Sequence, residues 1–444
     1  MDLLLSFILL GCLFGSLSGL IPGIGNTIVM MMLFPFLLST DNIYGILVFY
    51  IALLSIGQYT GSITSTVFSV PGETSSFPAV KEGHALFRQG LGALSISGCA
   101  IGSFIGSLLA VSFVLFISGY LHQFTFLYST KFLSSVLIVV LVFLIFSSYN
   151  KWYINLFLCL IGYFLATLGT GALNEHQTFT FGIDDLLLGI PLFTVITWLY
   201  VFPEIIRNWN IKIPKIKQLA YVKTPLKVHI YQIIRNFGSI IRGSVFGFFL
   251  GLTPYLTTII ASNVTYNIEV WLRKQKHKYD NNGDIGSLLA AETANNSAAL
   301  SSLLPLLLLG IPITSSEAIL SEILTAKGHF FDIDNFYDIF IMISYCLVII
   351  NIIGLIIAWP MAKYFAIFYV VDIRLIYSFV IAFCIAATIY LGWYNNALIY
   401  YVCVSVIFAM IGYFFRRFDT MPLVIVFMMQ DGIEENLIRL IYYM

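Results

Sequence analysis

The sequence predicts an all-α polytopic membrane protein with about 10–12 transmembrane helices and broken or re-entrant helical hairpins in two inverted repeats. Three observations support this fold class. Hydrophobic residues make up 59% of the 444 residues and charged residues 10%, against roughly 25% charged in soluble domains. Several apolar runs are long enough to cross a bilayer, which takes about 20 residues per helix. One glycine-rich stretch also occurs twice along the chain.

The predicted helices follow one another along the whole chain. Full spans are expected at residues 3–21, 91–117, 132–148, 154–172, 186–206, 237–252, 338–358, 375–392 and 396–414. Shorter apolar segments at 27–38, 43–57, 256–272, 299–311 and 362–371 are typical of half-helices or re-entrant arms. The first segment has neither a basic region before it nor a small-residue cleavage site after it. It is therefore predicted to be a retained helix and not a signal peptide.

The repeated stretch covers residues 11–28 and 243–260, which align at an offset of 232. The two copies share Gly11/Gly243, Phe14/Phe246, Gly15/Gly247, Gly19/Gly251, Leu20/Leu252, Pro22/Pro254 and Ile28/Ile260. Shared apolar composition does not explain three glycines spaced four apart and followed by a proline. We therefore interpret the two halves of the chain as copies of one repeat.

Each copy predicts a helix that packs closely against a neighbour and then breaks. Glycines at i, i+4 and i+8 leave one helical face without side chains, so another backbone can approach it. The proline removes a backbone donor, and the freed groups are tolerated at membrane depth only where protein or a water-filled cavity satisfies them. Matching breaks in two halves point to the binding site of a secondary transporter. The alternative is a packing motif followed by an ordinary proline kink.

The basic residues indicate the domain organisation and the orientation of the repeats. Twelve of the 22 Lys and Arg residues lie between Arg207 and Lys278, mostly in 207–235 and 273–278. The positive-inside rule places both segments in the cytoplasm. The second glycine-rich helix starts from this basic region, whereas the first starts from Met1-Asp2, which favours inverted repeats. The predicted units are a membrane repeat at 1–206, a cytoplasmic linker at 207–236 and a second repeat at 237–444.

Two segments rich in hydroxyl side chains interrupt the apolar pattern. Residues 58–76 end in Pro71-Gly72 and are predicted to form a re-entrant hairpin that lines a cavity. Residues 290–320 carry Glu292, Asn295 and Asn296 within about one helical turn, followed by a break at Gly310-Ile311-Pro312. Two amides beside a carboxylate in an apolar protein are costly unless they are paired or hold a ligand. The alternative for them is hydrogen bonding between helices.

A series of motifs carries a family resemblance in order along almost the whole chain. The motifs are Leu20-Ile21-Pro22-Gly23-Ile24-Gly25, Tyr59 with Gly61, Ser62, Pro71 and Gly72, Arg88-Gln89-Gly90, Ser103-Phe104-Ile105-Gly106, Thr178 to Gly182, Ala290 to Ala298, Leu309 to Pro312 and Glu434-Glu435-Asn436-Leu437. In these motifs the sequence resembles the TctA family, the large membrane subunit of tripartite tricarboxylate transporters. It departs from the family pattern at Pro254-Tyr255-Leu256-Thr257, at Ile313 and at Ser69, which leaves a divergent substrate open.

The resemblance implies a cation-coupled symporter for di- or tricarboxylates or related small organic anions in the bacterial inner membrane. It also implies two partners, a periplasmic solute-binding protein and a small membrane subunit, and a homo-oligomer remains open. An inverted-repeat channel and a lone carrier for a different small solute are the alternatives. The zero net charge gives no indication of a nucleic-acid partner, and the sequence contains no GxxxxGK[ST] loop and no HExxH motif. An enzyme is therefore not expected.

The predicted site uses helix N-termini as well as side chains. Backbone N–H groups behind the breaks form an anion site without arginine, and hydroxyls and amides complete the coordination. The predicted substrate-binding residues are Pro22, Gly23, Gly25, Asn26, Ser62, Thr64, Pro71, Gly72, Ser75, Asn295, Asn296, Pro312, Thr314 and Ser315.

The coupling ion, Na⁺ or H⁺, is assigned to Glu292, with backbone carbonyls as further Na⁺ ligands. Glu73 and Glu317 rank below Glu292 because they are expected near the membrane surface. No other metal and no cofactor is predicted. The six cysteines lie in apolar segments, and the six histidines show no spacing typical of metal ligands.

Overall fold

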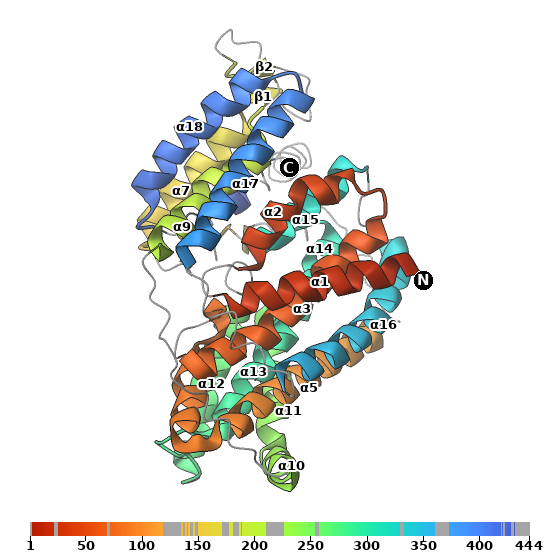
Figure 1. Cartoon of the computed structure of the whole chain (residues 1–444), viewed down its shortest axis with the longest axis vertical. Coiled ribbons are helices and arrows are strands. Elements are labelled where there is room, and N and C mark those ends of the chain that lie inside the picture. The colour runs from red at the N-terminus through yellow and green to blue at the C-terminus, as the bar shows by residue number, and fades with distance from the viewer. Residues whose placement is uncertain are drawn as a thin grey trace.

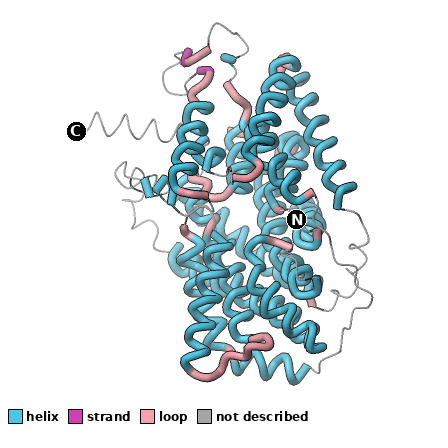
Figure 2. Tube along the Cα trace, turned by 90° about the vertical axis from the view of Figure 1, so that its left-hand side faces the viewer, coloured by secondary structure: helices cyan, strands magenta, loops and turns pink. Residues whose placement is uncertain are grey.

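The computed structural model describes residues 2–21, 25–68, 72–118, 150–170, 177–180, 189–209, 226–253, 257–328, 333–359 and 373–418, together with several shorter stretches. Helices account for nearly all of this part of the chain (Figure 2). The described strands are β1 (Gly169–Thr170) and β2 (Gln177–Thr178), which form a two-residue antiparallel ladder. The all-helical fold class is therefore confirmed for the described residues.

The helices follow the chain in two series. The first half contains α1 (Asp2–Leu20), α2 (Asn26–Ser39), α3 (Ile43–Phe68), η1 (Thr74–Ser76), η2 (Ala79–Gly83), α4 (His84–Leu86), η3 (Phe87–Leu91), α5 (Gly92–Ser118), α7 (Trp152–Ala166), α8 (Leu192–Val195), η7 (Ile196–Val201) and α9 (Phe202–Asn208). The second half contains α10 (Leu226–Arg235), α11 (Phe237–Gly251), α12 (Thr257–Gln275), α13 (Ile285–Ser301), α14 (Leu303–Leu309), α15 (Ser315–Ala326), α16 (Ile333–Ala358), α17 (Ile373–Tyr394) and α18 (Leu398–Phe415).

The helices form two groups along the longest axis of the molecule (Figure 1). Helices α7, α9, α17 and α18 gather at one end, close to the β1–β2 ladder. Helices α1, α3, α5, α10 to α13 and α16 form the other end. Helices α2, α14 and α15 lie between the two groups, and α2 packs directly against α15.

Both predicted helix breaks are present. Helix α1 ends at Leu20 before α2 begins at Asn26, and α11 ends at Gly251 before α12 begins at Thr257. Pro22 and Pro254 themselves lie outside the described residues. The order helix, break, helix, helix therefore occurs in both halves, as α1–α2–α3 and as α11–α12–α13.

The glycine faces have equivalent partners in the two halves. A Cβ atom at Gly19 would lie 2.2 Å from the carbonyl oxygen of Gly57 in α3, and one at Gly247 would lie 2.4 Å from that of Ala294 in α13. Each glycine-lined helix thus packs backbone to backbone on the helix that follows its broken partner. The shared packing supports the repeat interpretation, whereas the inverted orientation remains a prediction.

Four described segments are long and apolar enough to cross a membrane, namely Ile43–Val67, Ala79–Ile117, Tyr337–Ala358 and Leu398–Phe415. The pair α10–α11, bent by 60°, would make a fifth. Predicted span 362–371 and most of 132–148 lie outside the described residues, and predicted span 186–206 is divided among α8, η7 and α9. The predicted number of crossings and the domain boundaries at 206 and 236 remain predictions.

The predicted end of a half-helix at residue 57 is wrong, because α3 continues without interruption to Phe68. The hydroxyl side chains that suggested a break bond back to carbonyls of the same helix. Thr60 donates to the carbonyl of Ile56 at 2.9 Å, and Ser65 donates to that of Gly61 at 2.9 Å. Such bonds satisfy a buried hydroxyl within a helix. The first arm of the expected hairpin is therefore the last part of α3.

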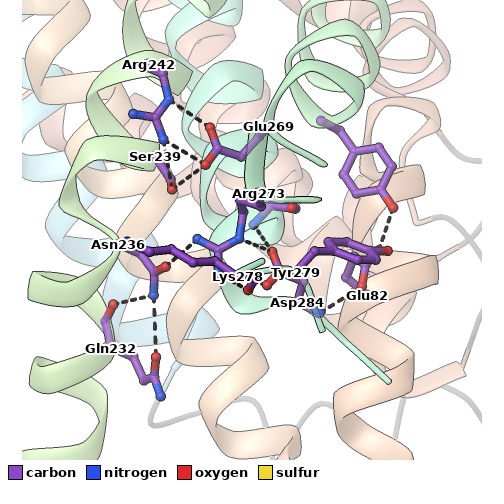
Figure 3. Close-up of polar contacts among 12 residues, drawn as sticks. Glu82, Gln232, Asn236, Ser239, Arg242, Glu269, Arg273, Lys278, Tyr279 and Asp284 are labelled. Carbon is purple, nitrogen blue, oxygen red and sulfur yellow. Dashed lines mark hydrogen bonds and ion pairs between the residues drawn. The ribbon is translucent and has the colours of Figure 1, made fainter. Parts of the chain in front are cut away.

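A buried carboxylate, Glu82 of η2, connects the two halves. Its side chain accepts hydrogen bonds from the hydroxyls of Tyr266 and Tyr279 and, at 2.8 Å, from the backbone N–H of Asp284 (Figure 3). Burial raises the pKa of Tyr279 to about 12, so its hydroxyl keeps its proton and remains a donor. Glu82 thus holds α12 and the start of α13 against the first half.

Replacing Glu82 with glutamine is expected to lower the free energy of unfolding by about 1–3 kcal/mol, because one of the three donors then faces an amide NH₂ group. Thermal unfolding of the purified protein in detergent measures this loss. The control is Glu322→Gln, since no hydrogen bond to the Glu322 side chain is seen in the described part of the chain. An equal change in melting temperature for the two variants would contradict the role of Glu82.

Candidate substrate and cation site

A chain of polar contacts lies where the break between α1 and α2 meets α3 and η1. The Ser18 hydroxyl donates to the Asn26 side-chain oxygen at 2.9 Å, and the Asn26 amide donates to Glu73 Oε1 at 3.2 Å. Gly57 of α3 leaves room for this chain, since a Cβ there would lie 2.8 Å from both Asn26 and Ser18. The break thus delivers Asn26, the first residue of α2, directly to a carboxylate.

Gly72 brings the following turn into the same region. A Cβ atom at Gly72 would lie 2.3 Å from the carbonyl oxygen of Gly19 and 2.7 Å from the Cα of Gly61. Only glycine allows the chain to pass this closely between α1 and α3. The turn leads into η1, which packs against both α12 and α13. Glu73 and Ser75, which belong to the first half of the chain, therefore lie against helices of the second half.

Helix α13 contributes three buried polar side chains. Glu292, Asn295 and Asn296 are each at most 2% exposed. The Asn296 amide donates to the Ser103 hydroxyl of α5 at 2.7 Å. By contrast, both oxygens of Glu292 and both polar atoms of Asn295 are buried without a hydrogen-bond partner. Glu292 also lies close enough to Glu73 for their charges to interact.

These unpartnered atoms form the candidate site, which we define as Asn26, Glu73, Ser75, Glu292 and Asn295. Glu73 Oε2 and the Ser75 hydroxyl are likewise buried, and they lie near each other. None of the ion pairs among the described residues involves Glu73 or Glu292. Buried polar groups in proteins are nearly always hydrogen-bonded, and buried charges are nearly always paired. The candidate site therefore offers unused donors and acceptors to a small ligand.

A small void lies between α3, α5, α13, α14 and α16, and its lining includes Asn296, the neighbour of Asn295 in the chain. It measures about 20 Å³ and is lined in part by Ser55, Gln58, Ser107 and Asn296. This volume suffices for one water-sized group. Neither the Ser55 hydroxyl nor the Gln58 amide has a partner there. Sequence reasoning missed Ser55 and Gln58, although a glutamine inside an apolar helix was a visible signal.

A further break, at residues 310–314 between α14 and α15, is arranged differently. Glu317 is fully buried, and its carboxylate accepts from the backbone N–H of Ile313 at 3.0 Å, from that of Thr314 at 3.1 Å and from the Ser302 hydroxyl at 2.8 Å. Thr314 in turn caps α15 by accepting from the N–H of Glu317. The N-terminus of α15 is thus already occupied by a carboxylate of the chain itself.

Glu317 is buried within the protein, as is one carboxylate oxygen of Glu73, whereas the expected position of both near the membrane surface remains a prediction. Glu317 is a buried cap, since helix N-termini attract anionic groups and this one lies within reach. Glu73 is part of the candidate site and reaches it through the close approach at Gly72. Sequence spacing could not reveal either position, because both depend on how the turns fold back.

The structure brings some of the predicted site residues together and leaves others apart. Asn26, Gly72, Ser75, Asn295 and Asn296 lie in or beside the candidate site, with Glu292. Gly25 caps the N-terminus of α2 without a side-chain bond, and Thr64 donates to the carbonyl of Gly19 at 3.1 Å. Pro22, Gly23 and Pro71 lie outside the described residues.

The remaining predicted residues make contacts of their own. Ser62 donates to the carbonyl of Tyr59 within α3. Pro312 and Thr314 belong to the break at residues 310–314. Ser315 shares a hydrogen bond of 2.9 Å with Thr27 of α2. None of the hydrogen bonds of this group among the described residues involves Glu292 or Asn295.

The apolar helices, the paired breaks and the enclosed polar site define a multi-pass membrane protein. Comparison with known families gives its place among them: the chain belongs to the tripartite tricarboxylate transporter TctA family, whose model matches residues 5–427. This is a family of transporters and not of enzymes. The resemblance seen in the sequence motifs is thereby confirmed.

One curated relative shows how far the similarity extends. The chain is 27% identical over 308 residues to a protein of Agrobacterium vitis described as "Uncharacterized 52.8 kDa protein in TAR-I ttuC' 3'region". The alignment covers 68% of this chain and 60% of the relative, so the chain spans well under two thirds of that protein's length. No solved structure matches the chain.

Proposed function

We propose that the protein is the large membrane subunit of a binding-protein-dependent transporter that takes up di- or tricarboxylates, or related small organic anions, together with a cation. The observation that carries the proposal is the candidate site, in which both oxygens of Glu292 and both polar atoms of Asn295 are buried without hydrogen-bond partners, near Glu73. Membership of the TctA family supports a carboxylate substrate and partner subunits. A solute-binding protein would deliver the substrate, and a small membrane subunit would complete the complex.

The amides and the break supply the chemistry for an anion. A carboxylate that leaves water needs replacement donors. The Asn295 amide has no hydrogen-bond partner among the described residues, and the Ser75 hydroxyl lies beside Glu73 in the same site. The first turn of α2, with Gly25 as its N-cap, adds backbone N–H groups and the positive end of the helix dipole. This combination binds an anion without arginine.

The two carboxylates supply the chemistry for the cation. Glu73 and Glu292 would repel each other and an anionic substrate if all three were charged and unpaired. A Na⁺ ion or a proton at this pair removes the repulsion, and the bound substrate then stabilises the cation in turn. Such reciprocal binding is the physical basis of coupling. In our proposal, Glu292 is the principal cation-coupling residue and Glu73 assists it.

The experiment is uptake of radiolabelled citrate and succinate into proteoliposomes that contain the complete three-component system, with and without a Na⁺ or pH gradient. Saturable accumulation that requires a cation gradient is expected. Uptake that neither saturates nor depends on a cation would favour the channel alternative. Full activity without a binding protein and a small subunit would favour the lone carrier.

Variants of the adjacent residues Asn295 and Asn296 are expected to distinguish a role in transport from a role in packing. Asn295→Ala is expected to reduce uptake about 10- to 100-fold through loss of a ligand-binding group, with little change in melting temperature, because Asn295 has no partner in the protein. Asn296→Ala is expected to lower stability by about 1–3 kcal/mol, because Ser103 loses its donor. Unchanged uptake by Asn295→Ala would refute the assignment of the substrate site.

A further inference from the structure

A second polar cavity lies at the bend between α10 and α11, away from the candidate site. It measures about 170 Å³, and its charged lining residues are Arg235, Arg242, Arg273, Lys276, Lys278 and Glu269. Five of these six side chains are cationic. The proposed transport chemistry uses none of them, so the cavity needs an explanation of its own.

Two of the five cations are paired within the protein. Arg242 donates to both oxygens of Glu269, at 2.9 and 2.8 Å, and Arg273 donates to Asp284 at 2.9 Å and to the Asn236 side chain at 2.8 Å (Figure 3). These pairs fix the two guanidinium groups in the wall. The carboxylate of each pair therefore sets the orientation of its arginine at the cavity.

The other three cations, Arg235, Lys276 and Lys278, are exposed, and no acidic partner for their side chains is found among the described residues. Among the described residues, Glu269 lines the cavity and Asp284 pairs with Arg273 from outside the lining, so five cations face two acids in all. The excess positive charge suits an anion with several oxygens, and arginine and lysine together are typical of phosphate recognition.

The surroundings of the cavity are apolar and uncovered. Helix α10 meets α11 at 60° and exposes Ile230, Tyr231 and Ile234, the last of these at 70%. On α12, Trp271 is 60% exposed. A short amphipathic helix bent away from a spanning helix is typical of a membrane interface, and tryptophan favours the headgroup level. The cavity thus lies beside surface that hydrocarbon would cover.

From the cationic cavity and the apolar surface beside it, we infer a binding site for an anionic phospholipid, with its headgroup phosphate among Arg235, Lys276 and Lys278 and its acyl chains along α10 and α11. Basic pockets of this kind at the cytoplasmic interface bind anionic headgroups. The site also bears on the fold, since Arg273 connects the cavity to Asp284, the N-cap of α13. An occupied site would hold the loop before α13, the helix that carries Glu292.

The inference is tested by native mass spectrometry of the detergent-solubilised protein with short-chain phosphatidylglycerol, with phosphatidylcholine of the same chain length and with inorganic phosphate. Phosphatidylglycerol is expected to bind at least about tenfold more tightly than either of the others. Equal binding of phosphatidylcholine would overturn the inference. Equal binding of inorganic phosphate would also overturn it, by assigning the cavity to a soluble anion.

The double variant Lys276→Gln, Lys278→Gln is expected to weaken phosphatidylglycerol binding at least about tenfold, because each lysine near an anionic lipid contributes separately. Both side chains are exposed, so the substitutions leave the packing of the protein intact. The control is Lys274→Gln, which is compared with each of the single variants Lys276→Gln and Lys278→Gln. It removes one charge next to the cavity, from a lysine that does not line the cavity and lies over the Tyr279 ring. Equal losses in the control and in the two single variants would show a diffuse charge effect and overturn the site.

Discussion

Replacing Gly247 with alanine is expected to prevent α11 from packing on α13 and to lower the free energy of unfolding by at least about 3 kcal/mol, the upper end of what overpacking costs. The added Cβ would lie 2.4 Å from the carbonyl oxygen and 2.5 Å from the Cα of Ala294. Both atoms belong to the backbone of a buried helix, so they cannot rotate away. Size-exclusion chromatography of the detergent extract should show aggregate or no protein.

The matched control is Gly25→Ala at the first break. A Cβ atom there would meet nothing within 4 Å, and its φ angle of −72° suits any residue. This variant is expected to give a monodisperse peak like that of the parent protein. A stable Gly247→Ala protein with an unchanged melting temperature would show that the two helices are not in backbone contact.

The second large effect is expected for Glu292→Gln, which is predicted to lose gradient-driven uptake while the protein stays folded. Glutamine has nearly the same shape but no charge, and a group near a bound cation typically contributes about 10- to 100-fold in affinity. Stability is not expected to fall, because neither oxygen of Glu292 has a hydrogen-bond partner to lose. Uptake and thermal unfolding should be measured on the same preparation.

Two further variants are compared with Glu292→Gln. Glu73→Gln changes a second carboxylate within the candidate site, and Glu322→Gln changes a carboxylate outside it. Glu73 has one oxygen bonded to Asn26, so its variant is expected to lose activity and also some stability. Glu322 lies on α15 and takes no part in the proposed site, so its variant should transport normally. Cation-driven uptake by Glu292→Gln at the parent rate would remove Glu292 from the coupling mechanism.

The sequence predicted the helices best where the pattern was local. The glycine spacing and the proline located the ends of α1 and α11, because a helix end depends on a few neighbouring residues. The length of α3 was not predictable in this way. Its serines and threonines resemble a loop by composition, yet their hydroxyls bond to carbonyls within the helix, as Thr60 does to Ile56.

The candidate site was predictable only in part, for a related reason. Asn295 and Glu292 stood out because polar residues inside an apolar repeat are costly. Their proximity to Glu73 depends on the turn at Gly72, which passes between α1 and α3, and on η1, which reaches α13. Such long-range contacts are set by tertiary packing, and one sequence carries no direct record of them.

The N-terminus of α15 is occupied by a carboxylate of the protein, whereas Gly25 caps α2 without a side-chain bond. A soluble anion that approached the break at residues 310–314 would compete with Glu317. The carboxylate of Glu317 already accepts hydrogen bonds from Ile313, Thr314 and Ser302. Because the Glu317 carboxylate is part of the same chain, its effective concentration at this helix end far exceeds that of any dilute solute. The break at residues 310–314 is therefore not expected to bind a carried anion.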